Sequence, residues 1–162
     1  MKRTLAMLAV LAIAMAAATL ARAQSAAEVP DSPQAMQVEA LVNRAAELLT
    51  KQGKAAIPAF REKGSEWYQG DVYLWAYDLD MHVLFNSAFP RRAGKLVKGE
   101  KDKKGKLFGE EFVKVAQTQG SGWVDYWWPK PGQSKPARKW SYVKAVTIDG
   151  RPAVVGAGFY PE

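Results

Sequence analysis

The chain has 162 residues, a formal net charge of +7 at pH 7 and no cysteine. The lack of cysteine excludes a disulfide framework, a thiolate nucleophile and a cysteine metal site. Packing must therefore hold the fold, and the six Trp, six Tyr and six Phe residues are dense enough to suggest a ligand pocket as well as a core.

The first 23 residues carry the three parts of a secretory signal peptide. Lys2 and Arg3 precede an apolar run over residues 5–20, which is followed by Ala21-Arg22-Ala23, a small-x-small cleavage site. We expect cleavage after Ala23, with an uncleaved anchor as the alternative, although the run is short for a membrane span. Cleavage leaves 139 residues and lowers the net charge from +7 to +4, which suits anionic metabolites or a membrane surface better than nucleic acid.

Residues 24–31 predict a flexible mature terminus ahead of a single domain over residues 32–162. Ser32-Pro33 is a helix start, and apolar residues then recur at three- and four-residue spacing until Gly53, which predicts a long amphipathic helix. A second, shorter helix is expected from about residue 54 to residue 63. The apolar stripe of the long helix fits packing against its own sheet or against the second subunit of a homodimer equally well.

Strand composition begins at Asp71. The expected elements are, in order, a hairpin over residues 72–77 and 83–85, a long surface loop over 87–106, a helix over 107–119, a strand over 123–128, and two strands over 140–148 and 153–160. The last two pair across Asp149-Gly150, a strong hairpin signal. The sequence therefore predicts an α+β fold, with one antiparallel sheet of about five strands and a long N-terminal helix packed behind it.

Five segments occur together in a recognisable order. They are the strand and turn at residues 72–80, the Lys-rich segment at 101–106, the Trp-rich strand at 122–131, Lys139-Trp140-Ser141-Tyr142 at the start of 139–144, and Gly156-Ala157-Gly158 within 155–160. Over residues 36–160 the chain thereby resembles the single-Cache family of PAS-like extracytoplasmic sensor domains. Two positions depart from that family: Met81 stands where a glycine is usual, and Asn86-Ser87 where His-Pro is frequent. An Asn amide offers a donor and an acceptor but no positive charge.

Candidate ligand contacts come from strand alternation and from the resemblance. Side chains alternate along a strand, so Tyr73 and Trp75 share a face, and we expect them to form a pocket wall instead of plain core. Trp123 and Tyr126 are the ligand candidates of the strand over residues 123–128, against an alternative of simple aromatic packing. The resemblance implies Lys139 and Tyr142, with Lys139 meeting a carboxylate; the alternative is a lysine that reaches water along neighbouring aromatics. We expect Lys139 and Tyr126 to hold a carboxylate or carbonyl between walls of Trp123 and Tyr142.

Other chemistry finds little support. The single His82 cannot build a zinc site unaided, and Asp78-Leu79-Asp80 lacks the later glycine and glutamate of a calcium loop. No hydrolase triad is recognisable either. Because no set of metal ligands has a useful spacing, neither a metal nor another cofactor is expected, and a chelator should change neither the stability of the protein nor its binding. The basic stretch from Arg91 to Lys106 is either a solvated loop or an electrostatic lip that draws anions or touches lipid headgroups.

These observations favour a periplasmic or secreted binding domain and not an enzyme. The resemblance implies that it captures a small organic acid or amino acid and presents it to a membrane receptor or transporter, in signal transduction such as chemoreception. The first alternative is a structural or accessory subunit whose own aromatics fill the pocket. An enzyme is the weaker alternative, and a nucleic-acid partner is not expected.

Overall fold

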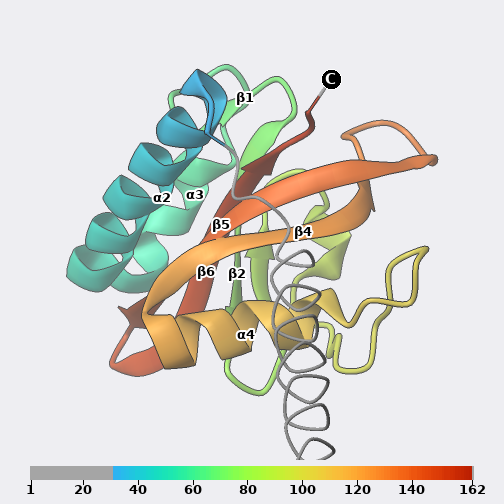
Figure 1. Ribbon diagram of the computed structural model, residues 1–162. Coiled ribbons are helices and arrows are strands. Elements are labelled where there is room, and N and C mark those ends of the chain that lie inside the picture. The colour runs from blue at the N-terminus through green and yellow to red at the C-terminus, as the bar shows by residue number, and fades with distance from the viewer. Residues whose placement is uncertain (1–30, 162) are drawn as a thin grey trace, which may run out of the picture.

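A computed structural model describes residues 31–161 (Figure 1). The expected signal peptide and cleavage site lie outside these residues, as does all of the expected flexible terminus except Asp31. Within the described range, no helix combines the length and the apolar character that crossing a membrane requires.

The first described helix, α2 (Pro33–Gln52), begins and ends where the sequence indicates. The Ser32 side chain accepts a hydrogen bond from the Ala35 amide at 3.1 Å, and Gly53, with a φ of 59°, closes the helix by donating to the Leu49 carbonyl. The apolar stripe, including Val42 and Leu49, is buried against the sheet. The chain's own sheet therefore occupies the stripe, which is not free for a second subunit.

The second helix is much shorter than expected. A 3-10 turn, η1 (Gly53–Ala56), leads into a single α-turn, α3 (Ile57–Phe60). Pro58 lacks an amide proton and suits only a first helical turn. Ile57 and Phe60 are buried, as their place on the inward side predicted.

One antiparallel sheet of six strands forms the centre of the molecule. The strands are β1 (Tyr68–Gln69), β2 (Val72–Asp78), β3 (Val83–Asn86), β4 (Ser121–Pro129), β5 (Pro136–Ile148) and β6 (Arg151–Phe159). They lie in the order β1-β2-β6-β5-β4, with β3 also paired to β2. The predicted α+β fold is confirmed, and the additional strand is the two-residue β1. Asp149 and Gly150 both have positive φ, as a tight hairpin turn requires.

Helices cover the two faces of this sheet separately. Helix α2 lies along one face, over β5 and β6, while α4 (Phe108–Gln119) crosses the other, over β4 and β5 (Figure 1). Two distinct clusters of buried side chains result, one beneath each helix. We call these the α2 face and the α4 face of the sheet.

The segment between β3 and α4, which includes the short turn η2 (Pro90–Arg92), is held in place by backbone hydrogen bonds. Gly94 donates to the Val83 carbonyl at 2.7 Å, and Val97 donates to the Met81 carbonyl at 3.0 Å. Met81 itself has a φ of 70° and is buried, so the turn keeps a backbone conformation typical of glycine although its side chain packs inward.

The Lys-rich part of this segment protects the edge strand β4. Asp102 accepts the Trp127 amide at 3.0 Å, and the Lys106 ammonium donates to the Asp125 carbonyl at 2.6 Å. These are backbone groups of an edge strand, which would otherwise be available for pairing with another chain. Asp102 and Lys106 thus have a structural task that a purely solvated loop would not perform.

Candidate ligand site

Strand alternation divides the six expected ligand contacts between the two faces of the sheet. Tyr73, Trp75 and Tyr126 belong to the buried cluster of the α4 face. Lys139 joins them because it lies directly opposite Tyr126 in the register of β4 and β5. We call the side chains gathered around this lysine the Lys139 cluster, and its members are Tyr73, Trp75, Tyr126, Lys139, Ser141 and Tyr160.

Trp123 and Tyr142 lie on the other face. They are opposite each other in the β4–β5 register, with ring centroids 5.3 Å apart, and both pack in the buried cluster beneath α2. The expected arrangement, in which these two rings form walls around Lys139 and Tyr126, is therefore corrected. Residues three positions apart on a strand, such as Lys139 and Tyr142, point to opposite faces.

Lys139 is the most unusual side chain of the structure. It is 0% exposed, and its Nζ has no hydrogen-bond partner. The ammonium lies 3.9 Å from the centre of the Tyr73 ring and 5.2 Å from that of Tyr160. Burial lowers the pKa of Lys139 to about 7, against a smaller opposing effect of the Asp71 carboxylate.

Neutral hydroxyl groups surround this amine. The Tyr126 hydroxyl lies 3.2 Å from Ser141 Oγ, and the Tyr160 hydroxyl donates to the Pro129 carbonyl at 2.8 Å. Burial raises the pKa of Tyr73, Tyr126 and Tyr160 above the ordinary value. All three tyrosines therefore stay uncharged at physiological pH and can donate or accept hydrogen bonds.

Two glycines of β6 make room for the cluster. A Cβ on Gly156 would stand 2.5 Å from the Trp75 ring, and a Cβ on Gly158 would stand 2.9 Å from Cε of Lys139 and collide with Ser141. The two glycines share one face of β6. Their missing side chains are what allow a large ring and a long lysine stem to lie flat on the sheet.

Helix α4 and the end of β4 close the cluster with further rings. Phe108 stacks on Tyr126 at 5.1 Å, and Phe112 lies 4.5 Å from Trp75 and 5.1 Å from Tyr126, centroid to centroid. The indole Nε1 of Trp75 is buried and, like the Lys139 amine, has no hydrogen-bond partner. Two unpaired donors thus lie within an otherwise aromatic environment.

A pocket of about 400 Å³ adjoins the cluster on the outside. It is lined by Tyr68, Asp71, Ala88 and Pro131, among others. Tyr68 contacts Tyr73 with centroids 6.0 Å apart, and Asp71 forms an ion pair with Lys130 at 3.2 Å. The Lys130 ammonium in turn lies 5.4 Å from the Tyr160 ring, so Tyr160 has the buried Lys139 and the more exposed Lys130 close to the same ring.

Sequence reasoning missed several of these residues. Ser141, Tyr160, Phe108 and Phe112 were not among the candidates. A signal for Ser141 existed, because it follows Lys139 by two positions and must share its face. The Gly156-x-Gly158 spacing was a second signal, since two glycines on one face of a strand indicate close approach of another group.

Residues 34–162 match the family profile described as the Cache domain. The chain belongs to the Cache domain family. A solved periplasmic sensor domain of a chemotaxis protein is 34% identical, with a TM-score of 0.70 over 80% of this chain and 95% of that one. Another, described under carboxylic acid recognition by a Cache chemosensory domain, is 26% identical, with a TM-score of 0.66 over 89% of this chain and 97% of that one.

A curated relative is the methyl-accepting chemotaxis protein McpP of Pseudomonas putida, which is 33% identical over 95 residues, or 59% of this chain. The match spans only 17% of that relative's length. A methyl-accepting chemotaxis protein from Vibrio parahaemolyticus, 20% identical with a TM-score of 0.61 over 77% of this chain and 86% of that one, shares the fold. Relatives of this Cache domain are thus sensory proteins of chemotaxis and not enzymes.

The departure from the family at Asn86 has a structural role in this Cache domain. Asn86 is buried directly opposite Trp75, and its side-chain oxygen accepts the Phe89 amide at 2.9 Å. Phe89 in turn packs its ring 5.9 Å from Tyr73. Asn86 therefore fixes the start of the loop that carries Phe89 onto the cluster.

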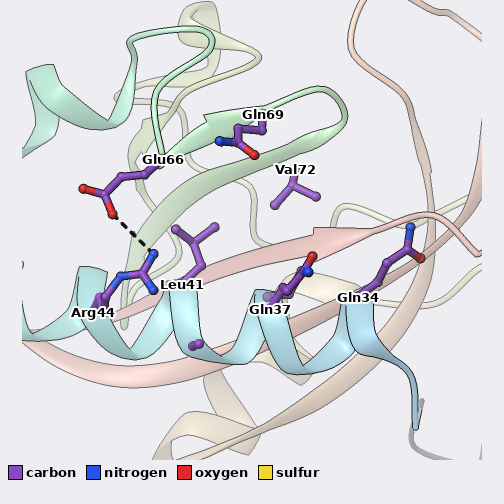
Figure 2. A pocket seen from close by; sticks show the side chains of 9 residues that line it. Gln34, Gln37, Leu41, Arg44, Glu66, Gln69 and Val72 are labelled. Atoms are coloured by element: carbon purple, nitrogen blue, oxygen red, sulfur yellow. Dashed lines mark hydrogen bonds and ion pairs between the residues drawn. The ribbon is translucent and has the colours of Figure 1, made fainter.

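An open groove between α2 and the β1–β2 edge is the main competing location (Figure 2). It measures about 450 Å³ and is lined by Gln34, Gln37, Arg44, Glu66 and Gln69, among others. Arg44 and Glu66 pair at 3.4 Å across it, and both are largely exposed. The one interaction drawn between the side chains of Figure 2 is the Arg44–Glu66 pair. None of the residues that line the groove has a buried polar atom without a partner, unlike Lys139 and Trp75 in the Lys139 cluster.

Metal ligands do not gather in the part of the chain that the structure describes. No group of three or more His, Asp or Glu side chains lies close enough to hold an ion among residues 31–161. His82 is exposed and lies 3.2 Å from the Asp78 carboxylate. The arrangement available for chemistry in this Cache domain is therefore a set of hydrogen-bond donors around one buried amine.

Proposed function

We propose that this Cache domain is an extracytoplasmic sensor that binds a small carboxylate at Lys139. The observation that carries the proposal is a fully buried lysine whose amine has no partner. Burying an unpaired charge costs several kcal/mol, roughly, so such groups occur where something else will pair with them. A ligand carboxylate is the group that would do so.

The surrounding donors suit an acid of this kind. The indole N–H of Trp75 is unpaired, and the hydroxyls of Tyr126 and Ser141 lie 3.2 Å apart beside the amine. A carboxylate has two oxygens that accept several hydrogen bonds. The aromatic rings of the α4 face would enclose a short apolar body.

A simple organic acid fits better than an amino acid. The ammonium group of an amino acid binds most strongly to a carboxylate, and the side chains of the Lys139 cluster include no acidic group. Asp71 is the carboxylate whose charge acts on Lys139, and it is already paired with Lys130. The related Cache domain described under carboxylic acid recognition supports the same choice.

Entry to the cluster would pass through the adjoining pocket. Lys139 is 0% exposed, so a ligand has to displace covering groups. The Asp71–Lys130 pair, at 3.2 Å, is the most exposed of these and the easiest to open, because exposed ion pairs contribute little, about 0–1 kcal/mol.

Two lysines of β5 provide a matched test. Calorimetry with a panel of acetate, propionate, succinate and citrate would identify the carboxylate that binds most tightly. We expect Lys139→Met to weaken it about ten- to a hundredfold, because a charge-assisted hydrogen bond contributes about 1.5–3 kcal/mol. Lys144→Met, on the α2 face where Lys144 donates to Asn43 at 2.7 Å, should leave affinity unchanged. Equal losses in both variants would indicate general electrostatics, and no loss in either would place the ligand elsewhere.

The second candidate function is an accessory subunit whose own aromatics fill the site. The closed packing favours it, since Phe112 approaches both Trp75 and Tyr126 and Lys139 is fully covered. Native mass spectrometry of protein purified from its own periplasm distinguishes the two. A retained small acid supports the sensor, whereas a bare protein that also ignores the panel supports the accessory subunit.

Export and a membrane partner complete the proposal. The signal-peptide pattern at residues 1–23 and the extracytoplasmic role of the chemotaxis relatives support a periplasmic protein that presents its ligand to a receptor or transporter. Sequencing the N-terminus of the mature protein should place it at Gln24. A protein that begins at Met1 and fractionates with membranes would instead have an uncleaved anchor.

A further inference from the structure

We infer that a carboxylate binds at Lys139 together with a proton, so that the domain responds to the carboxylate and to external pH through one side chain. The inference rests on the proposed function. It adds that the unliganded lysine is a neutral amine for part of the physiological pH range, and that ligand binding converts it into an ammonium.

The groups that face Lys139 carry no charge that could keep it protonated. They are Tyr73 from β2, Tyr126 from β4, Ser141 from its own strand and Tyr160 just after β6. The tyrosine hydroxyls titrate well above neutrality because they are buried. Phe108 and Phe112 of α4, which pack on Tyr126, are apolar.

The nearest charges lie outside the cluster and largely compensate each other. Asp71, in the β1–β2 connection, is 42% exposed in its side chain and paired with Lys130 at 3.2 Å. Its carboxylate favours the charged form of Lys139, but burial opposes it more strongly and holds the pKa at about 7. The lysine therefore titrates close to neutral pH.

The charges and protons of the binding step can be accounted for with these groups. A neutral amine, a proton from solvent and a ligand carboxylate combine into an ammonium–carboxylate pair, and no covalent bond forms or breaks. The buried site then holds no net charge before or after binding, which avoids the cost of an isolated ion in an apolar environment. Above the pKa of the free lysine, each pH unit should weaken binding up to about tenfold, because one proton is taken up per ligand.

Isothermal titration calorimetry on the mature protein tests this coupling. Sodium acetate and the other three members of the carboxylate panel are titrated between pH 6 and pH 9, in phosphate and in Tris, whose ionisation enthalpies differ. We expect the heat to differ between the buffers by approximately one proton per ligand at pH 8, where both buffers work, and the affinity to fall about fiftyfold between pH 7 and pH 9. Acetamide, an uncharged isostere of acetate, should show no such slope.

Variants of Lys139 test whether this side chain takes up the proton on binding. Lys139→Arg keeps a charge that does not titrate in this range, and Lys139→Met removes it, so both should bind with an affinity independent of pH. Lys144→Met should keep the wild-type slope, since Lys144 lies on the α2 face.

Each outcome decides something different. A carboxylate that binds wild type with a flat profile and no buffer dependence overturns the coupling but leaves the proposed function standing. A slope that persists in Lys139→Met also overturns the coupling, because another group then takes up the proton. Binding of none of the four carboxylates at any pH overturns the proposed function and the coupling together.

Discussion

The two faces of the sheet bury similar side chains but treat their polar groups differently. On the α2 face, the Tyr142 hydroxyl donates to Ser121 at 2.8 Å and the Lys144 ammonium donates to Asn43 at 2.7 Å. On the α4 face, the Lys139 amine and the Trp75 indole have no partner. Both faces are rich in aromatic rings, so aromatic density does not distinguish them, whereas the unpaired amine and indole do.

The largest expected effect is that of Lys139, on the α4 face, on the stability of the folded protein. A pKa lowered from 10.5 to about 7 corresponds to about 5 kcal/mol in favour of the unfolded chain at and below pH 7. Between the two values the unfolded chain binds more protons than the folded one, so the stability of the wild type rises with pH. Lys139→Met should therefore be more stable than wild type at pH 7, by a margin that shrinks by about 2 kcal/mol at pH 9.

Urea unfolding at several pH values measures this margin. Lys144→Met, from the α2 face, serves as the control and should follow the wild-type profile. If the curves of wild type and Lys139→Met ran parallel from pH 7 to pH 9, Lys139 would have an ordinary pKa in the folded protein, and the contrast between the faces would lose its electrostatic basis.

A smaller effect is expected from filling the space beneath the lysine. In Gly158→Ala the new Cβ would collide with the Trp140 carbonyl oxygen and Ser141 Oγ, and the backbone oxygen cannot rotate away. Overpacking of this kind costs about 1–3 kcal/mol, so the variant should unfold at lower urea concentration and bind the carboxylate more weakly.

Gly109→Ala, in the first turn of α4, is the matched control. Its Cβ would come no closer than 3.9 Å to Tyr77, and alanine favours a helix, so stability should hold or rise. Equal destabilisation by the two substitutions would mean that the α4 face tolerates added volume poorly everywhere and that Gly158 has no particular role.

The smallest effect is expected from removing the partner of Lys144 on the α2 face. Asn43→Ala removes the partner of Lys144, which is only partly buried and keeps access to water. We expect a loss of at most about 1 kcal/mol in unfolding free energy and no change in carboxylate affinity. A loss of affinity comparable to that of Lys139→Met would show that the two faces are coupled and would weaken the assignment of binding to one of them.

Much of the fold could be predicted because its signals are local. The Ser32 cap, the Gly53 stop and the Asp149-Gly150 turn act within a few residues, and each element they bound was found. The second helix was overestimated because its composition is helical, whereas Pro58 suits only a first turn and residues 53–56 before it form a 3-10 turn. The two-residue β1 was missed because its pairing with β2 depends on a partner and not on its own composition.

The candidate site was predicted in part. Tyr73, Trp75, Tyr126 and Lys139 do lie together on the α4 face, although their role as ligand contacts stays a prediction. Trp123 and Tyr142 were grouped with Lys139 because of the family resemblance and an argument from strand alternation, and the structure places both on the α2 face. Strand alternation by itself already opposes that grouping, since Trp123 and Tyr126 differ by three positions.

The sequence by itself determined which side chains share a face of each strand, because alternation depends only on the period of the extended backbone. Only the tertiary structure decided which face of the sheet packs against α4. It also decided that the Tyr160 ring lies near the amine of Lys139 and that this amine has no hydrogen-bond partner. Burial and pairing depend on strands brought together in the order β2-β6-β5-β4. The missing partner of Lys139 is therefore a property of the assembled sheet and of no single segment.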